Sequence, residues 1–185
     1  MNNEYLVMGL KDKIFLRRLS KQPERQTRFP HMERPLRVLI IYESDILERN
    51  DAIKAIRQDL LRQQMDTTLW GFVDKKEVVS LILPQSRILG PKDYTIWGTP
   101  DKQTLRDLQA EHYDLLLDLT THPCLPLRYL ALYAEADFKV GLNLGEGVHD
   151  MLLSPPELNT EEAKPEATWL YNLILQYLST IRSND

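Results

Sequence analysis

The chain has 185 residues, of which 43% are hydrophobic and 27% charged, as expected for one globular domain with a modest extension. Its longest apolar runs, such as Val38–Ile41, are far too short to span a bilayer. A single cysteine, Cys124, excludes an internal disulfide and a cysteine-rich zinc site, so together with a first segment unlike a secretory signal it favours a cytoplasmic protein.

The N-terminal segment is basic although the net charge of the chain is −4. Between Lys11 and Arg37 nine Lys and Arg residues stand against three acids, which leaves the remaining chain acidic. This asymmetry predicts an anionic partner, whether RNA, a membrane surface or an acidic protein. The alternative is that the segment folds back onto its own acidic domain. The candidate partner-binding residues are Lys11, Lys13, Arg17, Arg18 and Lys21.

Residues 4–21 are compatible with a helix, because Leu6, Leu10 and Ile14 recur at helical spacing. Apolar and basic positions are poorly segregated around it, which disfavours a helix that inserts into a membrane surface. Residues 22–35 carry three prolines and are predicted to form a linker. We therefore divide the chain into an arm and linker (1–35) and a folded domain (36–185).

Strands and helices alternate through that domain. We predict strands over 36–42, 67–73, 94–97, 113–120, 138–142 and 148–153, the first and fourth being continuous apolar runs typical of buried strands. We predict helices from Ser44 or Asp45 to about 65, over 75–83, from a Thr99-Pro100-Asp101 start to about 111, from Pro126, and from about 161 to 182. This alternation predicts a Rossmann-like α/β sandwich of three layers with a mainly parallel sheet of five or six strands.

In such sheets ligands bind beyond the carboxyl ends of the strands. The predicted ends supply several polar residues, among them Glu43, Asp74 and His149. The candidate crevice residues are Ser44, Asp45, Asp118, Thr120, Thr121, His122, Asn143 and Gly145. An acid, two hydroxyls and an imidazole over 118–122 could hold a polar ligand or perform acid–base chemistry. The alternative is that these side chains cap the backbone of the following helix.

Known catalytic and cofactor motifs are missing. Glu43-Ser44-Asp45 follows the first strand with no glycine, so the dinucleotide fingerprint is absent, and an acid there would repel a pyrophosphate. The stretch 141–147 has three glycines but no Lys-Ser/Thr of a phosphate loop. We therefore expect no cofactor and no metal, and whether the chain is an enzyme stays open. Cys124 precedes a helix, which could lower its pKa, but a buried inert thiol is the favoured interpretation.

Several motifs resemble those of an uncharacterised family of Bacteroidota proteins. They are Gly-Phe-Val-Asp-Lys-Lys at 71–76, Trp-Gly-x-Pro at 97–100, Tyr-Asp-Leu-Leu-Leu-Asp-Leu at 113–119 and Ala-Asp-Phe-Lys-Val-Gly at 136–141. The resemblance implies fold and kinship only. Residues 113–141 are also similar to the N-terminal half of heptosyltransferases, glycosyltransferases of the GT-B fold. Those enzymes need a second Rossmann-like domain, for which this chain has no room.

The leading hypothesis is a non-catalytic protein that contacts an anionic partner through its basic arm. The alternative is a small enzyme or a nucleotide- or sugar-binding domain that uses the strand-end crevice. A homodimer formed through the last helix, which is rich in Trp and Tyr, is a further possibility.

Overall fold

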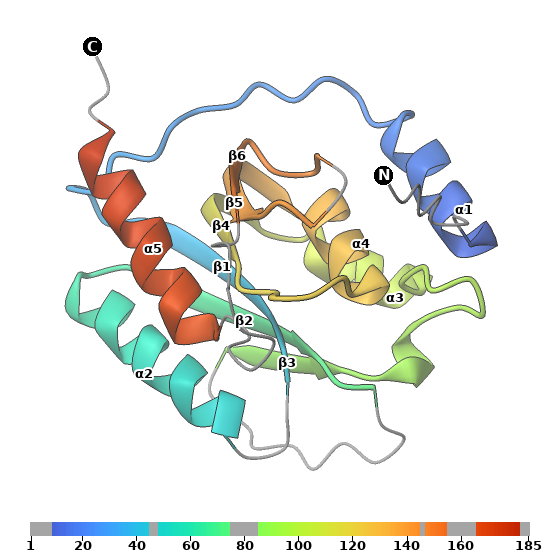
Figure 1. The fold of residues 1–185 in the computed structure, drawn as a ribbon, viewed down its shortest axis with the longest axis horizontal. Helices are drawn as coiled ribbons and strands as arrows, with labels where there is room; N and C mark the ends of the chain where they lie inside the picture. The colour runs from blue at the N-terminus through green and yellow to red at the C-terminus, as the bar shows by residue number, and fades with distance from the viewer. Residues whose placement is uncertain (1–8, 45–47, 75–84, 145–146, 155–165, 182–185) are drawn as a thin grey trace, which may run out of the picture.

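The computed structural model describes residues 9–44, 48–74, 85–144, 147–154 and 166–181. They form a six-stranded sheet in which every strand pair is parallel, with strand order β3-β2-β1-β4-β5-β6 (Figure 1). The strands are β1 (Arg37–Glu43), β2 (Asp66–Phe72), β3 (Ser86–Leu89), β4 (His112–Asp118), β5 (Glu135–Leu142) and β6 (Met151–Leu153). The predicted Rossmann-like parallel sheet is confirmed.

The sheet is buried because its central strands are apolar on both faces. In β1, Val38 and Ile40 point to one helical layer, whereas Leu39 and Ile41 point to the other. The first layer consists of α2 (Glu48–Arg62) and α5 (Ala167–Thr180), which contact each other. The opposite layer contains α4 (Leu125–Tyr133) and α3 (Lys102–Leu108).

The buried side of the last helix, α5, packs against the core of the same chain. Tyr171 of α5 packs in the core, and its hydroxyl donates to Asp59 Oδ2 of α2 at 2.6 Å. Tyr177 on the same helix remains 48% exposed. The homodimer through this helix stays a prediction.

The predicted third strand is wrong. The strand paired with β2 is Ser86–Leu89, while Tyr94 forms only an isolated antiparallel bridge with Pro100. The β-branched and aromatic residues of 94–97 suggested a strand, but Gly98 has a φ of +77° and reverses the chain directly after them. High β-propensity here belongs to a turn, since propensity gives way to local backbone geometry.

The predicted start of the next helix is wrong by two residues. Asp101, rather than Thr99, is its N-cap, because Asp101 Oδ1 accepts a hydrogen bond from the Thr104 amide at 2.7 Å. Pro100 cannot be the first helical residue because it is held in the bridge to Tyr94. The predicted helix at 75–83 and the predicted start near 161 lie outside the described residues.

Helix α1 (Leu10–Leu19) confirms a helix in the N-terminal segment over residues that the structure describes. It lies on the outer side of α4 (Figure 1). The segment predicted to be a linker runs along the surface of the domain and contacts β5. The Arg28 amide donates to the Asp137 carbonyl at 3.1 Å, and Phe29 packs edge-on against Phe138 at 5.2 Å. None of the helices in the described ranges is long and apolar enough to cross a bilayer.

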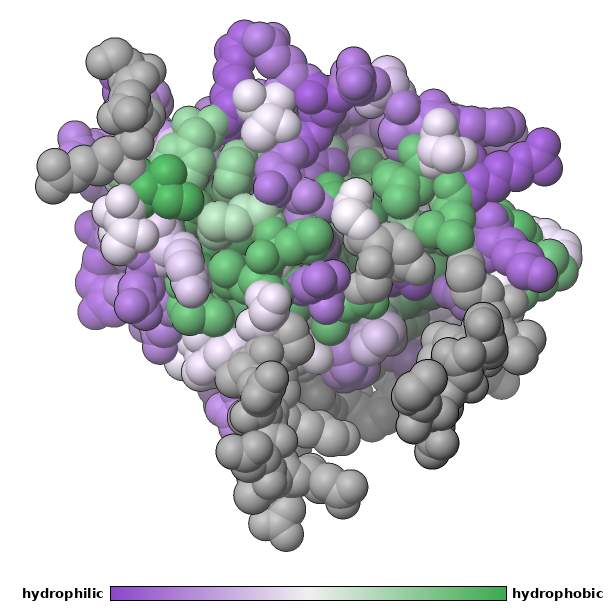
Figure 2. Space-filling model, turned by 45° about the horizontal axis from the view of Figure 1, so that its top comes forward, coloured by the Kyte–Doolittle hydropathy of each residue, from purple (hydrophilic) through white to green (hydrophobic). Residues whose placement is uncertain are grey.

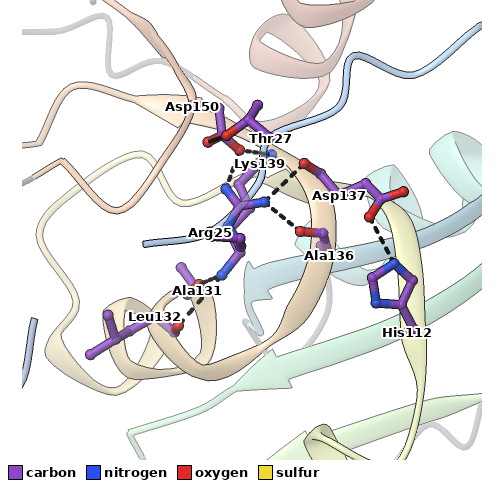
Figure 3. A network of polar contacts seen from close by, with 9 residues as sticks. All are labelled: Arg25, Thr27, His112, Ala131, Leu132, Ala136, Asp137, Lys139 and Asp150. Carbon is purple, nitrogen blue, oxygen red and sulfur yellow. Dashed lines mark hydrogen bonds and ion pairs between the residues drawn. The ribbon is translucent and has the colours of Figure 1, made fainter. Parts of the chain in front are cut away.

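A polar network fastens this segment to β5 (Figure 3). The Arg25 guanidinium donates to the Ala136 and Asp137 carbonyls and pairs with the Asp150 carboxylate. Asp150 also accepts from the Thr27 hydroxyl at 2.7 Å. Through these contacts residues 25–29 are held against the domain.

Lys139 lies under the same network and is 3% exposed. Its Nζ donates to the Ala131 carbonyl at 2.7 Å, near the C-terminus of α4 (Figure 3). Burial, reinforced by the nearby Arg25 guanidinium, lowers the pKa of Lys139 to about 8. This lysine therefore anchors the end of α4 and is closed to solvent.

Candidate functional site

The predicted cluster at 118–122 separates into two places. Asp118 and Thr120 are buried and line a small internal cavity, whereas His122 is exposed and lines an open crevice. Thr121, between them, is half-buried. A strand and the loop after it direct successive side chains to different sides, so nearness in sequence did not bring these groups together.

Asp118 pairs with His149, a residue that the sequence placed only at a strand end. His149 Nε2 lies 2.9 Å from Asp118 Oδ2, and Asp118 Oδ1 accepts from the Thr120 amide at 3.0 Å. The two paired side chains are 8% and 7% exposed. Gly141 makes this possible, since a Cβ there would lie 2.9 Å from both Asp118 Cβ and His149 Nε2.

The cavity beside this pair measures about 20 Å³. That is room for one water molecule, so no substrate could reach the imidazole without a rearrangement. The contact of Asp118 with the Thr120 amide is a local turn in the loop after β4. It does not cap α4, whose N-cap residue, Cys124, makes no side-chain capping hydrogen bond.

The open crevice has a volume of about 480 Å³ and lies beyond the carboxyl ends of β1 and β2. It adjoins the point where strand order reverses between β1 and β4, which is the usual ligand position in doubly wound sheets. It is lined by Glu43, Ser44, Phe72, Val73, Asp74, His122, Pro123, Cys124, Leu125 and Pro126. Among the predicted crevice residues that the structure describes, Ser44 and His122 line it.

Its polar groups are mainly acidic. Glu43 Oε2 lies 2.9 Å from His122 Nε2, with the Glu43 side chain 10% exposed and that of His122 57% exposed. Asp74 is an exposed second carboxylate on the same crevice. Two carboxylates disfavour a phosphate ligand, because like charges at close range repel.

Cys124 is not an activated nucleophile. Burial raises the pKa of its thiol to about 11, and the carboxylates of Glu43, Asp118 and Asp74 act in the same direction. The thiolate is the reactive form, and it is scarcely populated at neutral pH. Cys124 is half-buried, and its raised pKa supports the interpretation as an inert thiol, which stays a prediction.

Asn143, a further predicted crevice residue, lines neither place. Asn143 is exposed, and its amide donates to the Leu153 carbonyl at 2.8 Å to continue the pairing of β5 with β6. Asp45 and Gly145 lie outside the described residues. A metal site needs several histidine, cysteine or carboxylate ligands close together. In the part of the chain that the structure describes, no three such side chains are grouped so that they could hold a metal ion.

The basic arm forms a second candidate surface, and its inner side is docked. Phe15 is fully buried and meets the ring of Tyr129 edge-on at 5.1 Å. The Arg128 guanidinium lies over the Phe15 ring, 4.2 Å from its centroid, and pairs with Asp12 at 3.3 Å. These contacts fix α1 against α4.

The outer side of α1 carries the cations. We call it the basic face and define it by the exposed residues Lys11, Lys13, Arg17, Arg18 and Lys21. Lys13 and Arg17 are one helical turn apart, and Lys21 follows at the same spacing just past the helix end. Among the described carboxylates none pairs with Lys13, Arg17 or Lys21, and Asp12, the one acid of α1, is held by Arg128.

In the described part of this segment the segregation of apolar from basic side chains is partial, because Leu10 is 62% exposed on the same helix as the bases. Phe15, Leu16 and Leu19 pack in the cluster formed with α4, whereas Lys13, Arg17 and Lys21 are exposed. Arg18 is exposed as well, but its guanidinium donates to the Tyr133 hydroxyl of α4 at 3.2 Å.

Comparison with known proteins finds one relationship. The model of a family described as a family of unknown function matches residues 10–170, which includes α1 and most of the domain. No curated protein and no solved structure matches the chain.

Proposed function

The chain belongs to a family of unknown function (DUF6913), and we propose that this protein is a non-catalytic binding protein that docks on an anionic surface through the basic face of α1. The observation that carries the proposal is the orientation of α1. Its apolar side packs against α4, which leaves Lys13, Arg17 and Lys21 exposed on a helix held in place by Phe15 and Tyr129. Such an array raises the local concentration of phosphate-bearing partners.

Three features support binding over catalysis. The Asp118–His149 pair is closed, Cys124 is protonated at neutral pH, and the crevice has no glycine loop to hold a nucleotide. A helix that only completed the core would not need five exposed bases. Like charges one helical turn apart, such as Lys13 and Arg17, slightly destabilise a helix, so the stability of the fold does not favour them.

The test uses the full chain on immobilised heparin, a polyanion that belongs to neither RNA nor lipid. The wild type is compared with Arg17→Gln/Lys21→Gln, which removes two charges from the basic face. A matched control, Lys54→Gln/Arg62→Gln, removes two charges from α2. Both control cations form ion pairs within α2, at 2.8 and 3.3 Å.

We expect the α1 variant to elute at clearly lower salt and the α2 variant to elute like the wild type, since each lost phosphate-type contact weakens the salt dependence. Equal elution of all three proteins would contradict the proposal. Unchanged thermal unfolding of both variants excludes a folding defect as the cause.

The crevice offers a second candidate function, the binding of a small polar ligand. Its volume of about 480 Å³ and its place beside the strand-order reversal support this. The carboxylates of Glu43 and Asp74 favour a ligand that donates hydrogen bonds or carries positive charge, such as a sugar or an amine.

A thermal-shift screen with free sugars, polyamines and nucleotides tests this second function. We expect stabilisation by a sugar or an amine that Glu43→Gln abolishes, and none by nucleotides. Stabilisation by a nucleotide alone would contradict the ligand class.

A further inference from the structure

The turn before α3 exposes two large apolar side chains. Ile96 is 80% exposed and Trp97 is 45% exposed, and Ile96 is the most exposed large hydrophobic residue among those described. They occupy the tip of a turn in which the Gly98 amide donates to the Thr95 carbonyl at 2.8 Å. Turn tips are ordinarily polar, so an Ile-Trp pair there requires an explanation.

This turn is rigidly built. The Thr95 amide donates to the Thr99 carbonyl at 2.8 Å, and Tyr94 bridges to Pro100. The Tyr94 ring packs edge-on against Phe72 at 5.4 Å, and its hydroxyl donates to the Pro126 carbonyl at 3.3 Å. The tip is thus presented from a fixed base and is not a loop that could turn its apolar residues inward.

The turn and α1 are neighbours on α4. Contacts of Asp12 with Arg128, Phe15 with Tyr129 and Arg18 with Tyr133 show that α1 and α4 run in the same direction. The N-terminus of α1 therefore lies near Leu125, the first residue of α4.

Leu125 joins the two features. Its side chain packs with the cluster around Phe15, and it would lie 3.1 Å from a Cβ on Gly98. Figure 1 shows the turn, between β3 and α3, directly below α1. Leu10, at the same end of α1, is 62% exposed. Figure 2 is turned by 45° from Figure 1 so that its top comes forward, and green apolar residues lie among purple hydrophilic ones on its right, the side where α1 lies in Figure 1.

We propose that the Ile96–Trp97 turn inserts into the headgroup region of an anionic lipid bilayer while the basic face of α1 contacts the lipid phosphates. This inference rests on the proposed function and names its partner. Tryptophan prefers the membrane interface, and a short apolar anchor binds stably only when a basic patch supplies a second signal. The neighbouring turn and helix provide these two signals.

RNA would leave part of this surface without a role. Non-specific binding of single strands combines cations with several aromatic side chains on which bases stack. Near the N-terminal end of α1, the exposed apolar residues beside Trp97 are Ile96 and Leu10, which are aliphatic and cannot stack on bases. Aliphatic side chains gain from leaving water, which a bilayer allows and a nucleic acid does not.

The experiment measures co-sedimentation of the full chain with vesicles of phosphatidylcholine containing one third phosphatidylserine, and anisotropy of a labelled single-stranded RNA. The test variant is Ile96→Ser/Trp97→Ser. Its matched control is Leu61→Ser/Tyr177→Ser, which removes apolar residues of 46% and 48% exposure from α2 and α5 on the opposite layer. Circular dichroism confirms that each variant is folded.

We expect the turn variant to lower vesicle affinity by about tenfold and the control to leave it within twofold of the wild type, because only the turn meets the bilayer. A blue shift of tryptophan emission on vesicle binding that is absent in Trp97→Phe gives the same result by an independent measurement. Vesicles without phosphatidylserine should bind weakly, since the cations then lack their lipid partners.

Each alternative result separates the two proposals. Vesicle binding that Arg17→Gln/Lys21→Gln weakens but Ile96→Ser/Trp97→Ser does not would overturn insertion and leave the proposed function intact. Binding of the RNA alone would overturn the lipid partner while supporting an anionic one. Failure to bind heparin, RNA and vesicles would overturn both.

Discussion

Helices α1 and α2 both lie on the surface of the molecule, yet their charged side chains are paired differently. On α2, Lys54 pairs with Asp51 and Arg62 with Asp59, each within the helix. On α1 the one acid is taken by Arg128 of α4, and the outward bases are not paired with described carboxylates. A helix whose only task is to cover a core can balance its own charge. The surplus on α1 is therefore a feature that folding does not explain.

The docking of α1 has the largest predicted effect. Phe15→Ala should lower the free energy of unfolding by about 4 kcal/mol, because a fully buried aromatic ring is lost from between Tyr129 and Arg128. Leu61→Ala, an exposed change on α2, should cost less than about 0.5 kcal/mol. Urea unfolding measures both. A cost below 1 kcal/mol for Phe15→Ala would show that α1 is not held on α4.

Buried Lys139 should make the free energy of unfolding depend on pH. The pKa of Lys139 is about 8 in the fold against 10.5 for a free lysine, so between these values the unfolded chain binds more protons than the folded one. Stability from this group therefore rises with pH from about 8 to 10.5, by on the order of 3 kcal/mol.

Lys139→Met should remove that rise, and the difference between wild type and variant isolates it from tyrosines that titrate in the same range. Urea unfolding at pH 7, 9 and 10.5 measures it, with Lys92→Met as an exposed control. Parallel pH profiles of wild type and Lys139→Met would show that Lys139 remains charged in the fold.

Removing the acid of α1 should sharpen its contrast with α2. Asp12→Asn deletes the one negative charge of the helix, so heparin or lipid affinity should rise about fivefold. The lost pair with Arg128 is partly exposed and should cost less than about 1 kcal/mol. Weaker binding by a folded Asp12→Asn protein would show that Asp12 orients the basic face.

Making α1 resemble α2 has the smallest effect on stability. Lys13→Glu places an acid four residues before Arg17, the favourable order for an ion pair on a helix, and should add about 0.3 kcal/mol. Binding to anionic probes should fall despite this gain. Thermal unfolding and heparin elution, measured together, test whether the two properties move in opposite directions. If binding held while stability rose, Lys13 would lie outside the contact.

The sequence predicted the parts of the fold that depend on long apolar runs. The strand runs around Val38–Ile41 and Leu115–Leu117 identified β1 and β4, and their alternation with helices gave a parallel sheet. The edge strand Ser86–Leu89 was not predicted because it is short and half-buried. The turn around Ile96 was wrongly predicted as a strand because its residues are apolar and aromatic.

The candidate sites were only partly predictable, because their geometry depends on contacts between distant residues. The Asp118–His149 pair needs the missing Cβ of Gly141, and the docking of α1 needs Phe15 to find Tyr129 more than a hundred residues away. Charge composition, in contrast, is local, so the five bases of the basic face were identified from the sequence alone. The helical wheel of residues 4–21 disfavoured a membrane-surface helix. The exposed turn at Ile96 and Trp97, which supports a membrane contact, has no pattern in the sequence that distinguishes it from a strand.

The central claim is that the basic face of α1 is the binding surface, and lysine footprinting tests it on the unmodified protein. Acetylation rates are measured by mass spectrometry with and without heparin or anionic vesicles. We expect protection of Lys11, Lys13 and Lys21, with Lys54 on α2 labelled at its free rate. Protection of Lys54 equal to that of the three α1 lysines would contradict the claim.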